Sequence, residues 1–263
     1  MRLELSIALH LPRRGARHRY GDDPSQVAEL HLPRGRGPHP VVVLLHGGYW
    51  RPRYGKLLVR PLARDLVRRG SAVWNLEYRR LGTGRGGGGG WPATFDDVAR
   101  GVDALADLVG SGAPLDLGDV TLVGHSAGGQ LALWASQRTR LPAGAVGAAP
   151  RVPATRVVAL APVTDLVGAG APALALLGAG PSAAPERWAQ ADPLRAGAPP
   201  VPALVVHPTG DRTVPVARSR AYSAATGVAL LEVPGTHSDP ILPGTAAWTA
   251  AARWLATTVP PRA

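Results

Sequence analysis

The sequence predicts an α/β protein with a mostly parallel central sheet and helices on both faces. Short apolar runs typical of buried strands alternate along the chain with longer segments in which apolar residues recur at helical spacing. Such alternation is typical of a sheet flanked by helices. The length of 263 residues and the 45% share of hydrophobic residues suit one large core. We therefore expect a single domain over residues 1–263.

Most of the expected strands are short apolar runs. Residues 41–45 are apolar without interruption, which suits a central strand buried on both faces. Residues 3–11 instead alternate apolar and polar side chains, the pattern of a half-buried strand rather than of a signal peptide. Further strands are expected over 27–32, 72–78, 120–123, 157–161, 203–207 and 228–233.

The expected helices lie between these strands, at 57–69, 94–110, 127–137, 215–225 and 245–257. Thr94 has the residue type of a helix cap, and Gly110 would end the same helix. Residues 163–200 are rich in Ala, Gly and Pro and fit no strand, so we expect a small lid or irregular excursion over the mouth of a site. The glycine-rich loop at 82–90 lacks the Gly-Lys-Ser/Thr ending of a phosphate loop, which argues against nucleotide binding.

Composition excludes several classes of site. The chain has no Cys, so disulfides, a Cys nucleophile and thiolate metal sites are ruled out. The net charge of +11 comes almost entirely from Arg, with Lys56 the only lysine, and the arginines form no basic block. Because binding of nucleic acid needs clustered charge, we expect solvated arginines and no nucleic-acid partner. With no run long enough to span a membrane, we expect a cytoplasmic protein without a membrane partner.

The motif that carries the chemistry is Gly124-His125-Ser126-Ala127-Gly128. It matches the G-x-S-x-G nucleophile elbow of α/β-hydrolases, and an expected strand precedes it while an expected helix follows. Ser126 would take a strained backbone conformation in so tight a turn, and the flanking glycines remove side chains that would collide. The alternative, a glycine-rich turn with an incidental serine, does not account for this strand–turn–helix context.

A second motif, His46-Gly47-Gly48-Tyr49-Trp50, directly follows the expected strand at 41–45. In the α/β-hydrolase fold this loop supplies one wall of the oxyanion hole. Gly47 and Gly48 would let backbone N–H groups approach a tetrahedral oxyanion, and the N–H of Ala127 would form the second wall. Tyr49 and Trp50 would shape the substrate pocket. The alternative is a purely structural Gly-Gly turn followed by two packed aromatic residues.

A serine nucleophile needs a base, and the chain order in this fold is serine, acid, histidine. After Ser126 only His207 and His237 remain. His207 ends an apolar strand ahead of any suitable acid, so we interpret it as a structural histidine. His237 lies in a polar loop after the last expected strand, where it can reach over the edge of the sheet. We therefore predict that His237 is the base.

The acid is expected in the loop after the preceding strand, and Asp211 stands there. Gly210 permits the turn before it. Three rivals remain: Glu232 inside a strand, Asp239 close to the base in sequence, and Asp165, the most serious rival because triad acids can migrate between strands.

Other polar residues near these motifs have structural interpretations. His125 is expected to pack or hydrogen-bond locally rather than to transfer protons. Glu77, Tyr78 and Arg79 end a strand near the same rim, and we expect a salt-bridged edge there rather than a wall of the pocket. No group of His and carboxylates has metal-ligand spacing, so we expect neither metal nor cofactor.

With these motifs assembled, the chain resembles the kynurenine formamidase-like and small-carboxylesterase branch of the α/β-hydrolases. The resemblance rests on the two motifs above, the second extended to Gly129, and on Tyr20-Gly21-Asp22-Asp23-Pro24 before an expected strand. It implies hydrolysis of a carboxylic ester or an aryl formamide without a cofactor.

We therefore expect a serine hydrolase that forms an acyl-enzyme on Ser126 and accepts a small-molecule ester or amide, in a chain that could pair as a homodimer. A compact acyl group is expected from the bulk of Tyr49 and Trp50 beside the oxyanion glycines. The alternatives are a non-catalytic ligand-binding protein on the same fold, or a peptidase or thioesterase of the same superfamily.

Overall fold

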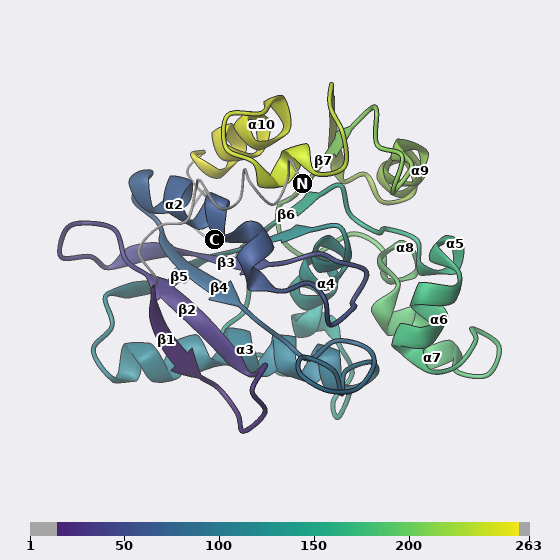
Figure 1. The fold of residues 1–263 in the computed structure, drawn as a ribbon, viewed down its shortest axis with the longest axis horizontal. Coiled ribbons are helices and arrows are strands. Elements are labelled where there is room, and N and C mark those ends of the chain that lie inside the picture. The colour runs from purple at the N-terminus through teal and green to yellow at the C-terminus, as the bar shows by residue number, and fades with distance from the viewer. Residues whose placement is uncertain (1–14, 258–263) are drawn as a thin grey trace.

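The computed structural model describes residues 15–257. Its eight-stranded sheet has the order β1-β2-β4-β3-β5-β6-β7-β8 (Figure 1). The β1–β2 and β2–β4 pairs are antiparallel, and every other pair is parallel. The prediction of a mostly parallel α/β sheet is confirmed, and the arrangement is that of the α/β-hydrolase fold. The strand expected at 3–11 lies outside the described residues.

The strands are β1 (Ala16–Arg19), β2 (Val27–His31), β3 (His39–Leu45), β4 (Ala72–Leu76), β5 (Leu115–His125), β6 (Arg156–Leu160), β7 (Ala203–Pro208) and β8 (Ala229–Val233). Two of them depart from expectation. β1 has the sequence Ala-Arg-His-Arg and carries no apolar pattern, so its extended form comes from pairing with β2. β5 begins five residues earlier than its apolar run, because Leu115 and Asp116 pair with the start of β3 before the register shifts.

The helices are η1 (Lys56–Val59), α2 (Arg60–Arg68), α3 (Ala93–Gly110), α4 (Ala127–Ser136), η2 (Arg138–Arg140), α5 (Leu166–Ala169), α6 (Ala171–Leu177), α7 (Pro185–Ala191), α8 (Pro193–Ala196), α9 (Val216–Thr226), η3 (Asp239–Ile241) and α10 (Ala246–Leu255). Among them, none is both long and apolar enough for a membrane span. Thr94 does not cap α3, which starts after Pro92. Its hydroxyl instead accepts from the N–H of Gly90 and donates to the carbonyl of Arg79.

The sheet is covered on both faces. Along β3, Val41, Val43 and Leu45 point into a core formed with α3 and α4, while Val42 and Leu44 point into a second core formed with α2 and α10. All five are at most 4% exposed, as expected for a central strand with helices on both sides.

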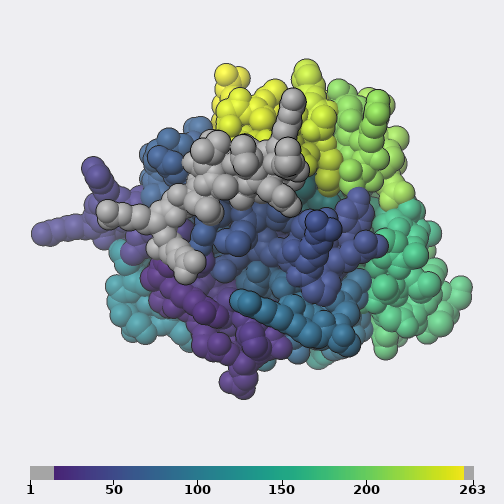
Figure 2. Space-filling model, viewed as in Figure 1, coloured from purple at the N-terminus to yellow at the C-terminus, as the bar shows by residue number. Residues whose placement is uncertain are grey.

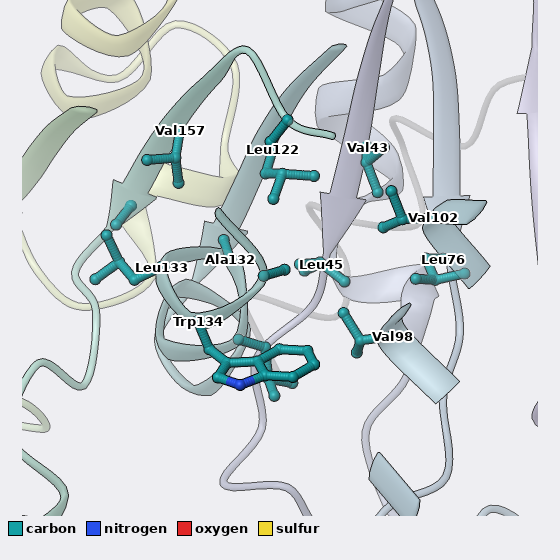
Figure 3. Packing of buried hydrophobic residues seen from close by; sticks show 14 of the residues in the cluster. Val43, Leu45, Leu76, Val98, Val102, Leu122, Ala132, Leu133, Trp134 and Val157 are labelled. Carbon is teal, nitrogen blue, oxygen red and sulfur yellow. The ribbon is translucent and has the colours of Figure 1, made fainter. Parts of the chain in front are cut away.

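Figure 3 shows the first of these cores, in which aliphatic side chains of the sheet meet α3 and α4. Trp134 of α4 lies over this layer, and its ring contacts that of Phe95 edge-on with centroids 4.9 Å apart. This packing fixes α4 against the sheet, and α4 begins at the residue after Ser126.

The segment at 163–200 forms the four short helices α5 to α8, which lie at the right edge of the molecule (Figure 2). It is tied to the rest of the domain by buried contacts. Leu176 and Trp188 are almost fully buried, the side-chain amide of Gln130 donates to Ala191, and the N–H of Trp91 donates to the carbonyl of Leu176. The expected excursion is thus a helical one that packs beside α4.

Candidate active site

Ser126 occupies a sharp turn between β5 and α4. Its backbone has φ 55° and ψ −118°, a region that residues other than glycine rarely adopt. The neighbouring glycines allow this turn: a Cβ on Gly124 would collide with Gly128, and a Cβ on Gly128 would collide with the end of β3. A Cβ on Gly129 would lie 2.8 Å from that of Pro162. The local sequence therefore produces the geometry of a nucleophile elbow.

His237 connects Ser126 to Asp211 through both ring nitrogens. Its Nε2 lies 3.0 Å from Ser126 Oγ, and its Nδ1 lies 2.6 Å from Asp211 Oδ2. The three residues follow β5, β7 and β8, whose carboxyl ends lie at one edge of the parallel sheet. Because a carboxylate only accepts, Nδ1 carries the proton, and the Nε2 lone pair is left to face the serine hydroxyl.

Asp211 is held as a carboxylate by several donors. Its Oδ1 accepts from the N–H groups of Thr213 and Val214 at 2.8 and 2.9 Å. Burial by itself would raise the pKa of Asp211, but hydrogen bonds from His207, His237 and Val214 outweigh burial and hold that pKa well below its usual range. The group is therefore charged at neutral pH and can orient His237.

The rival acids have other partners. Asp165 accepts from the N–H of Gly168 at the start of α5, and Asp239 accepts from the N–H and hydroxyl of Thr236. Glu232 pairs with Arg220 on the surface. Within residues 15–257, Asp211 is the carboxylate that contacts His237.

His125 supports the backbone of His237. Its Nε2 donates to the carbonyl of His237 at 2.8 Å, and the two rings pack with centroids 4.7 Å apart. Burial, reinforced by the neighbouring His237, lowers the pKa of His125 to about 3. A ring that stays neutral at working pH fits the expected local hydrogen-bonding role.

Gly47 lies directly beside the elbow. A Cβ at this position would stand 2.8 Å from the carbonyl oxygen of His125 and 3.1 Å from the Cβ of Ser126. Gly48 has φ +112° and leaves room for the ring of Tyr54. Ala127 is buried at the first position of α4, where a helix has free N–H groups. The three predicted oxyanion residues thus belong to the two backbone segments next to Ser126.

A buried network holds the glycine loop in place. His46 Nδ1 lies 2.8 Å from the carbonyl of Gly47, and its Nε2 lies 2.8 Å from Glu77 Oε1. The His46 ring stacks on Tyr78 with centroids 4.3 Å apart. Because the Gly47 carbonyl turns toward His46, the N–H of the same planar peptide, which belongs to Gly48, points away from His46.

Glu77 is the charged centre of this network. Arg80 pairs with it, and the N–H of Lys56 donates to its Oε2 at 3.0 Å. Burial would raise the pKa of Glu77, but His46 and Arg80 lower it below its ordinary value. The salt-bridged edge expected here is present, with Arg79 paired to Asp97 beside it. The sequence did not reveal that Glu77 reaches the loop at 46–50, because the two follow separate strands.

The two aromatic residues of the loop have different environments. Tyr49 is 43% exposed, whereas Trp50 is 2% exposed and belongs to the core on the α3 side. Trp50 therefore offers a substrate almost no surface and serves as an anchor of the loop. Both have positive φ, 56° and 54°, and this backbone twist separates side chains that are adjacent in sequence.

A hollow of about 420 Å³ lies elsewhere, between β1, β4 and α3. His18, Trp74 and Arg100 are among its lining residues, and Ser126, Asp211 and His237 are not. We therefore locate the candidate active site from the contacts around Ser126 and not from this hollow.

Comparisons with known proteins agree with the fold. The BD-FAE family model matches residues 29–225, well over half of the chain. A comparison with curated protein sequences finds no match.

Among solved structures, a truncated carbohydrate esterase from gut microbiota has a TM-score of 0.78 at 18% identity over 93% of this chain and 95% of its own. Esterase B from Lactobacillus rhamnosis, inhibited by a tributyrin phosphonate, has a TM-score of 0.77 at 22% identity over 97% and 88%. The butyrate-bound esterase Est2 from Thermogutta terrifontis has a TM-score of 0.71 at 18% identity over 95% and 96%. At these identities the likeness establishes the α/β-hydrolase architecture.

Proposed function

This chain belongs to the BD-FAE family, and we propose that it is a serine carboxylesterase that cleaves small-acyl esters through an acyl-enzyme on Ser126. The observation that carries the proposal is the continuous contact from Ser126 Oγ through His237 to the ionised Asp211. A hydroxyl, a neutral imidazole and a carboxylate in this order are the parts that activate a serine nucleophile.

In the proposed reaction, Ser126 Oγ attacks the ester carbonyl while His237 Nε2 takes the hydroxyl proton. The carbonyl oxygen becomes an oxyanion, stabilised by N–H groups of Gly47, Gly48 and Ala127. Collapse of this intermediate breaks the bond to the leaving alkoxide, which receives the proton from His237. Water then repeats the attack on the acyl-enzyme, releases the acid and regenerates Ser126. The positive helix end at α4 favours each oxyanion.

For the substrate, we propose a compact acyl group, formyl to butyryl, on an aromatic or otherwise activated leaving group. The exposed ring of Tyr49 beside the oxyanion glycines is the supporting feature. The short-chain ligands named for two of the similar structures, the tributyrin phosphonate and butyrate, point the same way. Cleavage of an aryl formamide is a second candidate, supported by the resemblance of the 46–50 and 124–129 motifs to the formamidase-like branch.

The first experiment is active-site labelling with a fluorophosphonate. The wild-type chain should be labelled and Ser126→Ala should not, because the phosphonate bonds to the serine oxygen. Ser126→Ala should also lower turnover by at least about a thousandfold, as expected for a triad that acts as a unit. Labelling of Ser126→Ala would show that another residue is the nucleophile. A wild-type chain that is not labelled would indicate a non-catalytic binding protein.

The second experiment measures kcat/KM over p-nitrophenyl esters of two to twelve carbons, with N-formylkynurenine, a thioester and a peptide amide in parallel. Short esters should be cleaved best, with a sharp decline once the acyl pocket is overfilled. Preference for decanoyl or longer esters would contradict the compact pocket. Faster cleavage of N-formylkynurenine than of the aryl esters would favour the formamidase.

A further inference from the structure

A second histidine approaches the carboxylate of Asp211. His207, near the end of β7, is completely buried, and its Nε2 lies 3.2 Å from Asp211 Oδ2. This is the same oxygen that lies 2.6 Å from His237 Nδ1. The sequence places His207 at a strand end and assigns it only a structural role, since nothing in the pattern shows that its ring turns toward the acid.

The neighbours of His207 determine where its proton lies. Its Nε2 is 2.9 Å from the carbonyl oxygen of Val214 as well as close to Asp211, and both of these oxygens only accept. Nε2 therefore carries the hydrogen, which bonds to the carbonyl of Val214 and lies beside Asp211 Oδ2. On the other side, Nδ1 lies 2.7 Å from the hydroxyl of Ser219, a fully buried residue of α9 that can donate to it. Ser219 is thus compatible with the tautomer in which the Nε2 hydrogen of His207 faces Val214 and Asp211.

We propose that His207, whose tautomer is set by the acceptors at Nε2, is a positioning residue that limits how strongly Asp211 stabilises the protonated form of His237. The inference rests on the proposed serine mechanism and adds a second donor to the acid that this mechanism uses.

The physical basis is competition for one oxygen. An N–H group beside Asp211 Oδ2 stabilises the negative charge of the carboxylate. The carboxylate then stabilises a protonated His237 less strongly. Without His207, the carboxylate would stabilise protonated His237 more strongly. A protonated His237 cannot accept the proton of Ser126. The base must therefore lose activity at a higher pH once His207 no longer donates.

The other titratable groups around this contact are few. His125 at the end of β5 faces His237, and its low pKa keeps it neutral through this range. Glu232 of β8 is paired with Arg220 on α9. Neither supplies a proton to Asp211 Oδ2, so a change at His207 should be visible in the acid limb of the pH–rate profile.

The test compares kcat and KM across pH 4.5 to 8 for the full chain and four variants. His207→Met removes the donor and keeps the bulk, whereas His207→Gln places an amide N–H near the former Nε2. His31→Met is the matched control, because His31 is also a buried histidine near a carboxylate, 3.6 Å from Glu29, but lies at the antiparallel end of the sheet. Ser219→Ala removes the proton donor to Nδ1.

For His207→Met we expect the acid limb of kcat/KM to move up by about half a pH unit or more, with a several-fold fall in kcat at pH 6 and little change in KM. Ser219→Ala releases the other side of the His207 ring and should therefore move the limb in the same direction. It serves as the test if His207→Met does not fold by circular dichroism. His207→Gln should lie nearer the wild type, and His31→Met should match it.

An unmoved acid limb in folded His207→Met and in Ser219→Ala would overturn the inference and leave His207 a packing residue. Failure of the serine mechanism itself would look different, since the wild-type chain would then hydrolyse no ester or would keep its phosphonate label in Ser126→Ala.

Discussion

Gly47 approaches Ser126 so closely that a methyl group on Gly47 would stand 3.1 Å from the Cβ of the serine. The same methyl group would stand 2.8 Å from the backbone carbonyl of His125, which cannot move without moving the elbow. The loop at 46–50 and the turn at Ser126 are therefore fitted to each other through backbone contact, and the absence of a side chain at position 47 is a geometric requirement.

Gly47→Ala should consequently lower kcat by about a hundredfold to a thousandfold, the loss typical of removing one oxyanion donor. The global fold should survive, because the collision concerns one loop. Gly110→Ala is the control, since a Cβ there meets nothing within 4 Å. Steady-state kinetics on a short aryl ester measure the effect, and equal rates for Gly47→Ala and wild type would contradict the proposed oxyanion loop.

Asp211→Asn should lower kcat by orders of magnitude, about ten-thousandfold in the best-studied triad, while KM changes little. The amide can donate to Nδ1 of His237 and would thereby favour the tautomer whose Nε2 cannot accept the proton of Ser126. Asp165→Asn is the comparison, because Asp165 caps α5 and has no contact with His237. A large loss in Asp165→Asn with a small one in Asp211→Asn would reverse the assignment of the acid.

Glu77→Gln should reduce both stability and turnover. The neutral amide cannot balance the charge of Arg80, and an uncompensated buried charge typically costs about 3–5 kcal/mol. Release of His46 should also loosen the Gly47 carbonyl and so lower kcat. Denaturant unfolding and kinetics measure the two effects, with Glu232→Gln as a matched loss of an exposed ion pair, for which we expect a much smaller change. Full activity in a destabilised Glu77→Gln would mean that the Glu77 network stabilises the fold but does not position the proposed oxyanion loop.

His125 predicts a pH dependence of stability. Burial lowers its pKa from 6.5 to about 3, so between these values the unfolded chain binds a proton at His125 that the folded chain does not. The free energy of unfolding must therefore fall as pH drops below 6.5, by up to about 1.4 kcal/mol per pH unit from this residue. Urea unfolding at pH 7, 6 and 5 should show a steeper decline for wild type than for His125→Gln. Parallel declines would mean that His125 is protonated in the folded protein.

The sequence predicted the elements whose signal is local. Residues 41–45 could be identified as a central strand because every side chain is apolar, and the elbow because its glycines stand at fixed positions around Ser126. The contacts of Asp211 and His237 could be expected because both residues follow strands of one parallel sheet, whose carboxyl ends share an edge. The order of the strands and the spacing of the motifs were therefore sufficient to predict the central strand, the elbow and the contact between Asp211 and His237.

What the sequence could not predict depends on side-chain direction or on distant partners. Trp50 and Tyr49 are neighbours in sequence, and the sequence pattern does not show that Trp50 is buried while Tyr49 is exposed. β1 has a polar sequence and becomes a strand only by pairing with β2. Glu77 and His207 reach the site through contacts across strands or turns, which a linear pattern does not encode.

β8 is the last strand of the sheet, and we expect the site to open more readily than the rest of the fold because of it. All five of its residues are exposed or half-exposed, whereas β7 next to it is almost entirely buried. Yet β8 leads to His237, and its end and the following turn accept backbone hydrogen bonds from Thr209 and Gly210 just before Asp211. Local unfolding of β8 and the turn after it would separate Asp211 and His237 from Ser126 while the tryptophan-rich core stayed folded. Amide protons of residues 229–237 should then exchange faster than those of β5, and hydrolysis should cease at a lower urea concentration than the one that unfolds the core.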